Sequence, residues 1–339
     1  MKAKLKSKLN LENRVPLQDV IPLETPFLLY VDPSSACNFK CQFCPTGHKD
    51  LVKESEYRRS TISFDLFKKI ILDLNDFEKP IKVLRMNKIG EPLLNKNLSK
   101  MVEFAKKSGL VEYIDLATNG SLFSRDLLSQ LVNAGLDRLN ISMEGVNQEQ
   151  YLKNAKVNIN FDRFIENIQW LYINKGDCEI TIKIPGNLIT NDQKNDFINY
   201  FGNYCDSIFI EDLAPIWPSF DVEKRAGIKI KDKEGQYKQP LQKKDTCAVI
   251  FYAIAVNADG SVSACCPDWN QKLIVGDVRT ESLKNIWNSL KMNTLRRQHL
   301  EGKRSENPIC SNCGHLSYAQ VDNIDPYRES LIEKFPGTL

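Results

Sequence analysis

The 339-residue sequence predicts an α/β fold in which a parallel sheet with crossover helices precedes a small domain built around cysteines. Three observations predict it. Short β-like runs alternate with amphipathic helical stretches from residue 27 to about 212, the composition shifts to Pro, Lys, Asp, Gly and Gln over residues 215–244, and residues 247–318 contain five cysteines. Such alternation is typical of parallel strands joined by helices, and the shift in composition indicates a domain boundary.

The first part of the chain contains six units of this kind. Apolar residues recur between the β-like runs at helical spacing, as in Phe67, Ile70, Ile71 and Leu74, and we expect these side chains to be buried in the core. The expected strands cover residues 27–31, 81–86, 111–116, 136–142, 179–184 and 207–210.

The second part predicts a hairpin and one helix. Residues 252–256 and 261–264 flank a turn that ends in Gly260, whose freedom to adopt a positive φ suits a hairpin tip. The helix is expected to begin near Glu281, with one apolar face formed by Leu283, Ile286, Trp287 and Leu290.

The charge pattern names no macromolecular partner. The 46 basic and 43 acidic residues give a net charge of +3, too balanced to indicate nucleic-acid binding. Four lysines lie in the first ten residues, but no apolar stretch follows them as in a signal peptide, and no run reaches the ~18 apolar residues of a membrane helix. We expect a solvated basic leader on a cytoplasmic protein, with no nucleic-acid or membrane partner.

Cysteine spacing is the strongest chemical signal in the sequence. The chain has ten cysteines, and in a cytosolic protein these indicate metal or redox chemistry more than disulfides. Cys37, Cys41 and Cys44 lie within eight residues directly after the first strand, and no suitable fourth ligand is near. A closed structural zinc site needs four ligands, whereas a 4Fe-4S cluster held by three thiolates leaves one iron open for another molecule.

The CX3CX2C spacing, with Phe43 before the last cysteine, resembles the signature of the radical S-adenosylmethionine (radical SAM) superfamily. The resemblance implies a partial (β/α)6 TIM-like barrel whose open lateral side admits the substrate. It also implies that S-adenosylmethionine binds the open iron and is split to a 5'-deoxyadenosyl radical, so that the cofactor supplies the difficult chemistry. Phe43 is then expected to contact the cofactor.

The resemblance extends to the segment after the second strand, Ile89-Gly90-Glu91-Pro92. It is similar to the family's GGE segment, which receives the amino group of S-adenosylmethionine, although Ile89 replaces the first glycine. The segment stands where barrel enzymes place their sites. In most proteins a lone Gly-Glu-Pro forms only a turn, and that alternative stays open.

Two further segments are similar to those that contact S-adenosylmethionine in the family. Asn119 closes the third strand, where an ordinary Asn-Gly turn is an equal alternative. Ser142 and Glu144 end the fourth strand, where a hydroxyl and a carboxylate suit the ribose hydroxyls.

A second set of cysteines lies in the small domain. Cys247 is followed by twelve residues, Gly260, four residues and Cys265, and Cys310 and Cys313 come later. Taken alone, these four cysteines could equally hold structural zinc. Beside the first motif, the CX12GX4C spacing resembles the SPASM/twitch group, and the count of four implies the shorter twitch form with one auxiliary 4Fe-4S cluster suited to electron transfer.

The remaining cysteines and histidines carry weaker signals. Cys266 follows a predicted ligand, and we expect it to be packed there, although a thiol that returns a hydrogen atom to a substrate radical is the functional alternative. Cys178 and Cys205 are expected in the core. The three histidines, His48, His299 and His315, form no spaced ligand pair. His315 could touch the auxiliary cluster, but we expect it to be a surface residue.

These observations divide the chain into an N-terminal extension (1–26), a radical SAM partial barrel (27–214), a linker (215–246), an auxiliary cluster domain (247–318) and a C-terminal tail (319–339). The resemblance implies an oxidoreductase that takes hydrogen from a small molecule, with a sugar or aminocyclitol alcohol as the leading substrate class. The reducing partner would be a flavodoxin or ferredoxin.

Other readings remain open at this point. The residues Arg85, Lys88 and Asp268 lie near the expected pocket, but none is identified as the base. A peptide-modifying enzyme or an epimerase is the main alternative, less favoured because about 26 residues before the first strand are too few for a peptide-binding domain. A non-enzymatic zinc scaffold is a distant one.

Overall fold

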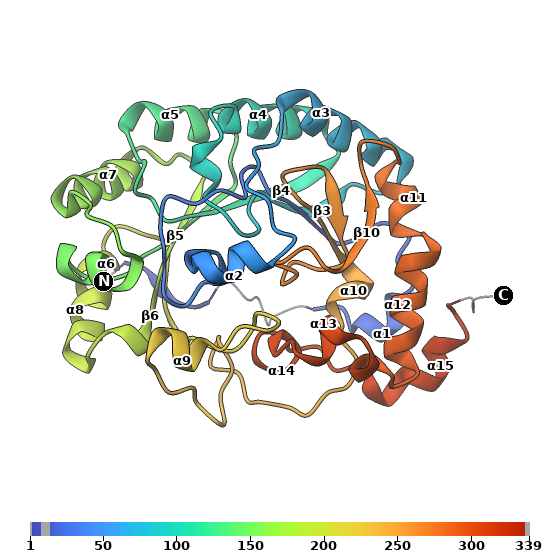
Figure 1. The fold of residues 1–339 in the computed structure, drawn as a ribbon. Coiled ribbons are helices and arrows are strands. Elements are labelled where there is room, and N and C mark those ends of the chain that lie inside the picture. Colours follow the sequence, from blue (N-terminus) through green and yellow to red (C-terminus); the bar gives the residue numbers. More distant parts are fainter. Residues whose placement is uncertain (1, 8–13, 336–339) are drawn as a thin grey trace.

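The computed structural model describes residues 2–7 and 14–335, which form one ten-stranded sheet with helices packed around it (Figure 1). The strand order is β1-β7-β6-β5-β4-β3-β2-β8-β9-β10. Pairing is parallel from β1 to β8 and antiparallel from β8 to β10. The predicted α/β class and the partial barrel are confirmed.

All six predicted strands are present, within one or two residues of the expected ends. They are rich in branched apolar residues on both faces, as expected for parallel strands that are covered on both sides. Their bounds are β2 (Leu28–Val31), β3 (Ile81–Arg85), β4 (Val111–Thr118), β5 (Arg138–Ser142), β6 (Glu179–Pro185) and β7 (Ser207–Glu211).

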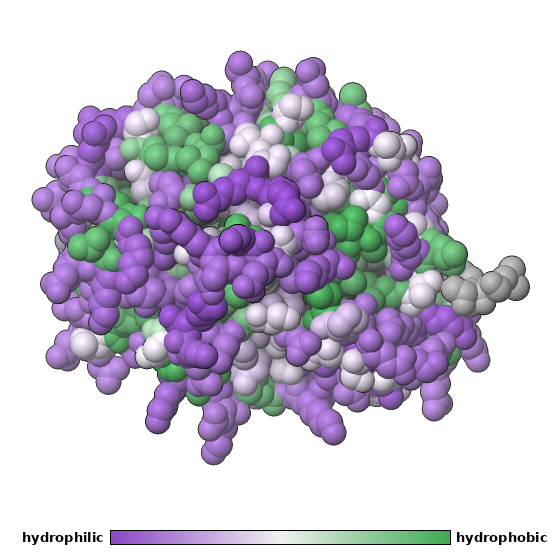
Figure 2. All heavy atoms as spheres, in the orientation of Figure 1, coloured by the Kyte–Doolittle hydropathy of each residue, from purple (hydrophilic) through white to green (hydrophobic). Residues whose placement is uncertain are grey.

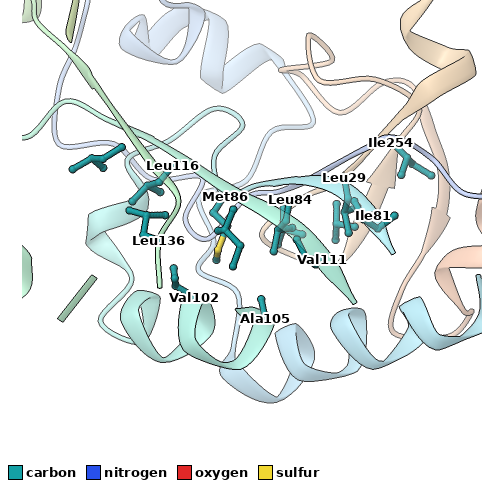
Figure 3. Close-up of a cluster of buried hydrophobic side chains, with 14 of the residues drawn as sticks. Leu29, Ile81, Leu84, Met86, Val102, Ala105, Val111, Leu116, Leu136 and Ile254 are labelled. Carbon is teal, nitrogen blue, oxygen red and sulfur yellow. The ribbon is translucent and has the colours of Figure 1, made fainter. Parts of the chain in front are cut away.

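The helices cover the outer face of this sheet. Figure 3 shows Val102 and Ala105 of α4 pointing toward Leu84 of β3 and Met86 directly after it, and all four side chains are fully buried. Side-chain N-caps begin several helices, for example Ser63 at α3. The larger barrel helices are α3 (Phe64–Leu72), α4 (Leu98–Ser108), α5 (Arg125–Asn133), α6 (Gln148–Ala155), α7 (Phe161–Asn174) and α8 (Asn191–Phe201).

The predicted hairpin is confirmed as β8 (Ala253–Val256) and β9 (Ser261–Ser263), followed by β10 (Ile274–Asp277). Gly260 at its tip has a φ of +95°, the conformation for which glycine is suited. Strand β8 pairs in parallel with β2, so the cysteine-rich region continues the barrel sheet through backbone hydrogen bonds. Its helices are α10 (Val249–Tyr252), α11 (Leu283–Trp287), α12 (Leu290–Leu300), α13 (Pro308–Ser311) and α14 (His315–Tyr318).

The single helix predicted from Glu281 is wrong in its extent. The first helix ends at Asn288, and Ser289 caps a new helix by accepting a hydrogen bond from the N–H of Met292. Leu290 is consequently 66% exposed and does not share the buried face of Leu283 and Trp287. A serine cap inside an apolar pattern offers the backbone an alternative to continuous helix.

The prediction of a solvated basic leader is also corrected for the residues that the structure describes. Lys4 and Leu5 form β1, which pairs in parallel with β7, and Ala3 is buried. Strand β7 would otherwise present unpaired backbone groups at this edge of the sheet, and the leader covers them. Residues 8–13 lie outside the described part.

The segments expected as linker and C-terminal tail also contain helices. Helix α9 (Val222–Ala226) lies within residues 215–246, and α15 (Arg328–Ile332) packs on α12 with Leu331 buried. Two short helices, α1 (Leu17–Val20) and α2 (Lys49–Glu54), complete the set. Hydrophilic side chains dominate the face in Figure 2, and among the described helices none is long and apolar enough to cross a membrane.

Candidate functional site

A cavity of about 700 Å³ lies at the carboxyl ends of the barrel strands and brings most of the predicted site together. Its volume falls in the range of small-molecule sites. Pro92 does not line it; the residue is buried and begins the short helix behind Glu91. The predicted residues that do line it are Cys37, Cys41, Phe43, Cys44, Gly90, Glu91, Asn119, Ser142 and Glu144.

The loop with the first three cysteines is held against the segment after β3. The N–H of Glu91 donates to the carbonyl of Ala36 at 2.8 Å, one residue before Cys37. A Cβ atom on Gly90 would overlap the carbonyl oxygens of Ser34 and Ala36, so only glycine permits this approach. The glycine is therefore needed to position the cysteine loop.

Glu91 ties this segment to the end of β4. Its carboxylate accepts the Thr118 hydroxyl at 2.6 Å, the Asn119 N–H at 2.8 Å and the Leu93 N–H at 3.0 Å. Burial raises the pKa of Glu91, and these three donors oppose that shift. Asn119 in turn donates to Asn38 in the cysteine loop at 3.0 Å, so it has a structural role beside the expected one.

Glu144 provides a buried group whose second oxygen is unsatisfied. Burial raises its pKa to about 8, the Lys183 ammonium lowers it and the Glu211 carboxylate raises it. Its Oε2 atom has no hydrogen-bond partner among the described residues, although buried polar atoms are nearly always paired. A hydroxyl group of a bound molecule in the cavity would satisfy this oxygen, which fits the expected ribose contact.

The first three cysteines suit a metal group that displaces their protons. Burial raises the pKa of Cys37 to about 12 and raises those of Cys41 and Cys44 as well. Cys37 and Cys44 each add to the shift of Cys41, so the three sulfurs lie within electrostatic reach of one another. Such thiols become thiolates only when a metal replaces the proton. The residues present therefore fit an iron-sulfur cluster.

The four cysteines of the second set line another cavity, together with His299, Arg304 and His315. Burial raises the pKa of both Cys310 and Cys313 to about 12, and the charge of Cys247 adds to each shift. In residues 2–7 and 14–335, no three His, Cys, Asp or Glu side chains lie close enough together to hold a single metal ion. The four cysteines nevertheless line one cavity together, and thiols as donors fit a metal group that would replace their protons.

The two cavities share a wall. Val249, Pro267 and His315 line both of them. The neighbouring cysteines separate at this wall, because Cys265 lines the smaller cavity and Cys266 lines the larger one. Cys266 is thus placed at the larger cavity, whereas the sequence favoured a packed cysteine beside a ligand.

Two residues at the second set were not identified as functional candidates in the sequence. His299 accepts the Cys247 N–H on Nδ1 at 3.2 Å, and Gln320 donates to the Cys247 sulfur at 3.2 Å and contacts His315 Nδ1 at 2.9 Å. Burial and the neighbouring Arg304 lower the pKa of His299 to about 3, so its ring is neutral. Both residues are more than fifty positions from Cys247, and no spacing pattern links them to it.

The side chains considered as the base, those of Arg85, Lys88 and Asp268, form ion pairs or hydrogen bonds within the protein. Arg85 lines the larger cavity but pairs with Asp115 at 2.6 Å. The Lys88 ammonium is buried and donates to Asn257, Ser263 and the backbone carbonyl of Asp268 at 2.5, 3.2 and 2.8 Å.

Asp268 itself is fully buried and lines the smaller cavity. Its carboxylate accepts from the Ser263 hydroxyl and from the backbone of Lys272 and Leu273. Its backbone carbonyl accepts from Lys88, which lines the larger cavity, but Asp268 does not itself line that cavity. Cys178 and Cys205 are buried in the core as predicted.

The open three-cysteine site on a partial barrel defines a radical S-adenosylmethionine enzyme, and the sequence profile described as the Radical SAM superfamily matches residues 31–200. The chain belongs to this superfamily. A second profile, described as an iron-sulfur cluster-binding domain (SPASM), matches residues 247–314. Together they imply 4Fe-4S clusters and S-adenosylmethionine as cofactors.

Curated relatives match part of the chain. A tungsten-containing aldehyde ferredoxin oxidoreductase cofactor-modifying protein of Pyrococcus furiosus is 31% identical over 34% of this chain and 30% of its own length. A GTP 3',8-cyclase of Clostridium acetobutylicum is 26% identical over 60% of this chain and 61% of its own. The chain thus spans between about a third and three fifths of the length of these relatives.

Solved structures share the fold at low identity. BtrN in complex with AdoMet and 2-DOIA has a TM-score of 0.55 at 19% identity, covering 87% of this chain and 97% of BtrN. SuiB of Streptococcus suis bound to S-adenosylmethionine has a TM-score of 0.64 at 14% identity, covering 89% of this chain and 74% of SuiB. These similarities support the fold of both parts of the chain.

Proposed function

We propose that this enzyme oxidises a carbinol on a sugar or aminocyclitol to a ketone. The shared wall of the two cavities is the observation that carries the proposal, because Val249, Pro267 and His315 line both the larger cavity and the cavity of the second set of cysteines. BtrN, a radical SAM dehydrogenase of 2-deoxy-scyllo-inosamine, has the same fold. We propose that Cys37, Cys41 and Cys44 hold the catalytic cluster and that Cys247, Cys265, Cys310 and Cys313 hold the auxiliary one.

When bound, the cofactors supply a 5'-deoxyadenosyl radical that takes one hydrogen atom from the carbinol carbon and an auxiliary cluster that accepts one electron. The hydroxyl proton leaves to a base, so two electrons and two protons are accounted for. The chain's own residues would bind and orient the molecules: Glu91 and Gly90 would hold the methionine end of the cofactor, and Ser142 and Glu144 would hold its ribose. A flavodoxin or ferredoxin would reduce the catalytic cluster.

The larger cavity offers the substrate both polar and aromatic groups. Asn87, Lys183 and Gln236 line it together with Trp217 and Tyr252. Trp217 and Gln236 come from residues 215–246, so the segment expected as a linker contributes to this wall. A polyhydroxylated ring would meet hydrogen-bonding groups and apolar faces here, as small-molecule sites commonly provide.

The test uses reconstituted enzyme, S-adenosylmethionine and a panel that includes 2-deoxy-scyllo-inosamine and other aminocyclitols and sugars, each deuterated at one carbinol carbon. Dehydrogenation transfers that deuterium to 5'-deoxyadenosine and gives a ketone. A product that keeps all its hydrogens but exchanges one with solvent would contradict dehydrogenation.

Cys266 favours a second candidate, epimerisation or other modification of a peptide or sugar. Its place at the larger cavity suits a thiol that returns a hydrogen atom, and the structure of SuiB bound to the precursor peptide SuiA has the same fold at a TM-score of 0.61. In D2O, epimerisation would introduce one deuterium into the product at the inverted carbon. Dehydrogenation would introduce none at that carbon, because it becomes a carbonyl.

A further inference from the structure

His299 is a buried histidine with one nitrogen engaged and the other unpaired. It lies in the last turn of α12, and its side chain is 0% exposed. The backbone N–H of Cys247 donates to Nδ1, so Nδ1 carries no proton. In a neutral imidazole the remaining nitrogen then carries it, and Nε2 is a hydrogen-bond donor.

This donor has no acceptor within the described ranges. Nε2 is buried from solvent and makes no hydrogen bond there, and the ring lines the cavity that the four cysteines surround. An unpaired buried N–H is costly, and native structures rarely contain one. The unpaired Nε2–H on a cavity wall indicates an acceptor that occupies the cavity.

We propose that His299 donates a hydrogen bond from Nε2 to a sulfur atom of the auxiliary cluster and thereby raises its reduction potential. Hydrogen bonds to cluster sulfurs favour the reduced state, because reduction places more negative charge on them. The inference rests on the cysteine ligand set proposed above but not on the substrate.

The same hydrogen bond to Nδ1 argues against His299 as an iron ligand. Coordination through Nε2 needs that nitrogen without its proton, and the Cys247 N–H occupies Nδ1, so the ring would have to be an anion. Histidine ligands usually donate their other N–H to an acceptor, whereas here the other nitrogen accepts. The geometry therefore favours a donor.

Gln320, which follows α14, makes a second side-chain contact with Cys247. Its Nε2 donates to the Cys247 sulfur at 3.2 Å, while its Oε1 accepts the Ala248 N–H at 3.1 Å. The two side chains hold one ligand loop between α12 and the C-terminal segment. Gln320 already has its sulfur acceptor in the protein, whereas the acceptor of His299 would come with the cluster.

The test compares His299→Leu with His299→Gln in full-length reconstituted enzyme. Electron paramagnetic resonance during a redox titration follows the signal that S-adenosylmethionine does not perturb. We expect His299→Leu to weaken reduction of that cluster by roughly tenfold, equal to about 59 mV for one electron, and His299→Gln to restore most of it. Met292→Leu, buried on the same helix but not at the cavity, is the packing control.

A measurement on the unmodified protein keeps the proposal testable if His299→Leu loses the cluster. Pulsed electron paramagnetic resonance with 15N-labelled histidine should detect one weakly coupled nitrogen and an exchangeable proton at the auxiliary cluster. A strong coupling typical of an iron–nitrogen bond, no nitrogen coupling, or an unchanged potential in His299→Leu would each overturn the proposal. None of these measurements uses substrate, so their failure is distinct from a failure of the proposed oxidation.

Discussion

Cys265 and Cys266 are consecutive residues that line different cavities. Cys265 lies with Cys247, Cys310 and Cys313, whereas Cys266 lies at the cavity that also contains Cys37. The loop after β9 therefore contributes one thiol to each site. This arrangement gives opposite expectations for two substitutions at neighbouring positions.

We predict that Cys265→Ala removes the auxiliary cluster, so that iron content falls by about four atoms per chain while cleavage of S-adenosylmethionine persists. Cys266→Ala should keep both clusters. Iron and sulfide analysis after anaerobic reconstitution checks both results. Should Cys266→Ala instead form 5'-deoxyadenosine with substrate but no product, the epimerase candidate would replace dehydrogenation.

We predict that Cys37→Ala abolishes reductive cleavage of S-adenosylmethionine. Two thiolates cannot hold the cluster with one defined open iron, and 5'-deoxyadenosine should fall to background while the auxiliary signal remains in electron paramagnetic resonance. Cys178→Ala, in the buried core, is the matched control and should retain cleavage. Persistent cleavage in Cys37→Ala would show that another group completes the catalytic site.

We predict that Gly90→Ala prevents loading of the catalytic cluster, because its new Cβ atom would overlap the backbone oxygens of Ser34 and Ala36 and displace the cysteine loop. The cost in stability should be at least ~1–3 kcal/mol, as for other overpacked sites. Thermal unfolding and iron content measure the two effects.

Gly109→Ala is the control for this variant. Gly109 has a φ of +70° and open space where a Cβ atom would stand, so alanine there adds backbone strain of roughly 1–2 kcal/mol without a clash. It should lose stability but bind iron normally. If both variants load the catalytic cluster equally, the close approach at Gly90 is not needed for the loop.

We predict that Asp32→Asn changes the free energy of unfolding of the iron-free protein in a pH-dependent way. The difference between the variant and the unsubstituted protein should favour the variant more at pH 7 than at pH 4. Burial raises the pKa of Asp32 from 3.8 to about 6, although the Lys88 ammonium opposes this shift. Between these values the folded state binds the extra proton, so the contribution of Asp32 to stability is full below pH 3.8 and is lost as the pH rises through 6.

The relative gain in Asp32→Asn between pH 4 and pH 7 should be about 2–3 kcal/mol, because the pKa shift of about two units contributes ~1.4 kcal/mol per unit and pH 4 lies just above 3.8. Urea unfolding at pH 4 and pH 7 measures it. Asp65→Asn, on the exposed surface of α3, is the control for loss of a surface carboxylate. A stability difference for Asp32→Asn that does not change with pH would rule out a raised pKa.

The barrel could be predicted closely because its signals are local. Continuous apolar runs and helical spacing mark the elements, and all six strands are present where the pattern indicated them. The error at Leu290 arose from the same local patterns, since a serine within an apolar pattern can either remain inside a helix or cap a new one. Packing decides between these outcomes.

The sequence by itself determined the class of chemistry, because its signals are local. The three cysteines of CX3CX2C lie within eight residues, and the glycine directly precedes Glu91. The tertiary structure alone decided which cavity Cys265 and Cys266 each line, that Asp268 lines the smaller cavity, and that His299 lies at the second set of cysteines. These relationships join residues far apart in the chain or depend on where a loop turns. They arise only when β8 pairs with β2 and His299 of α12 accepts the backbone N–H of Cys247.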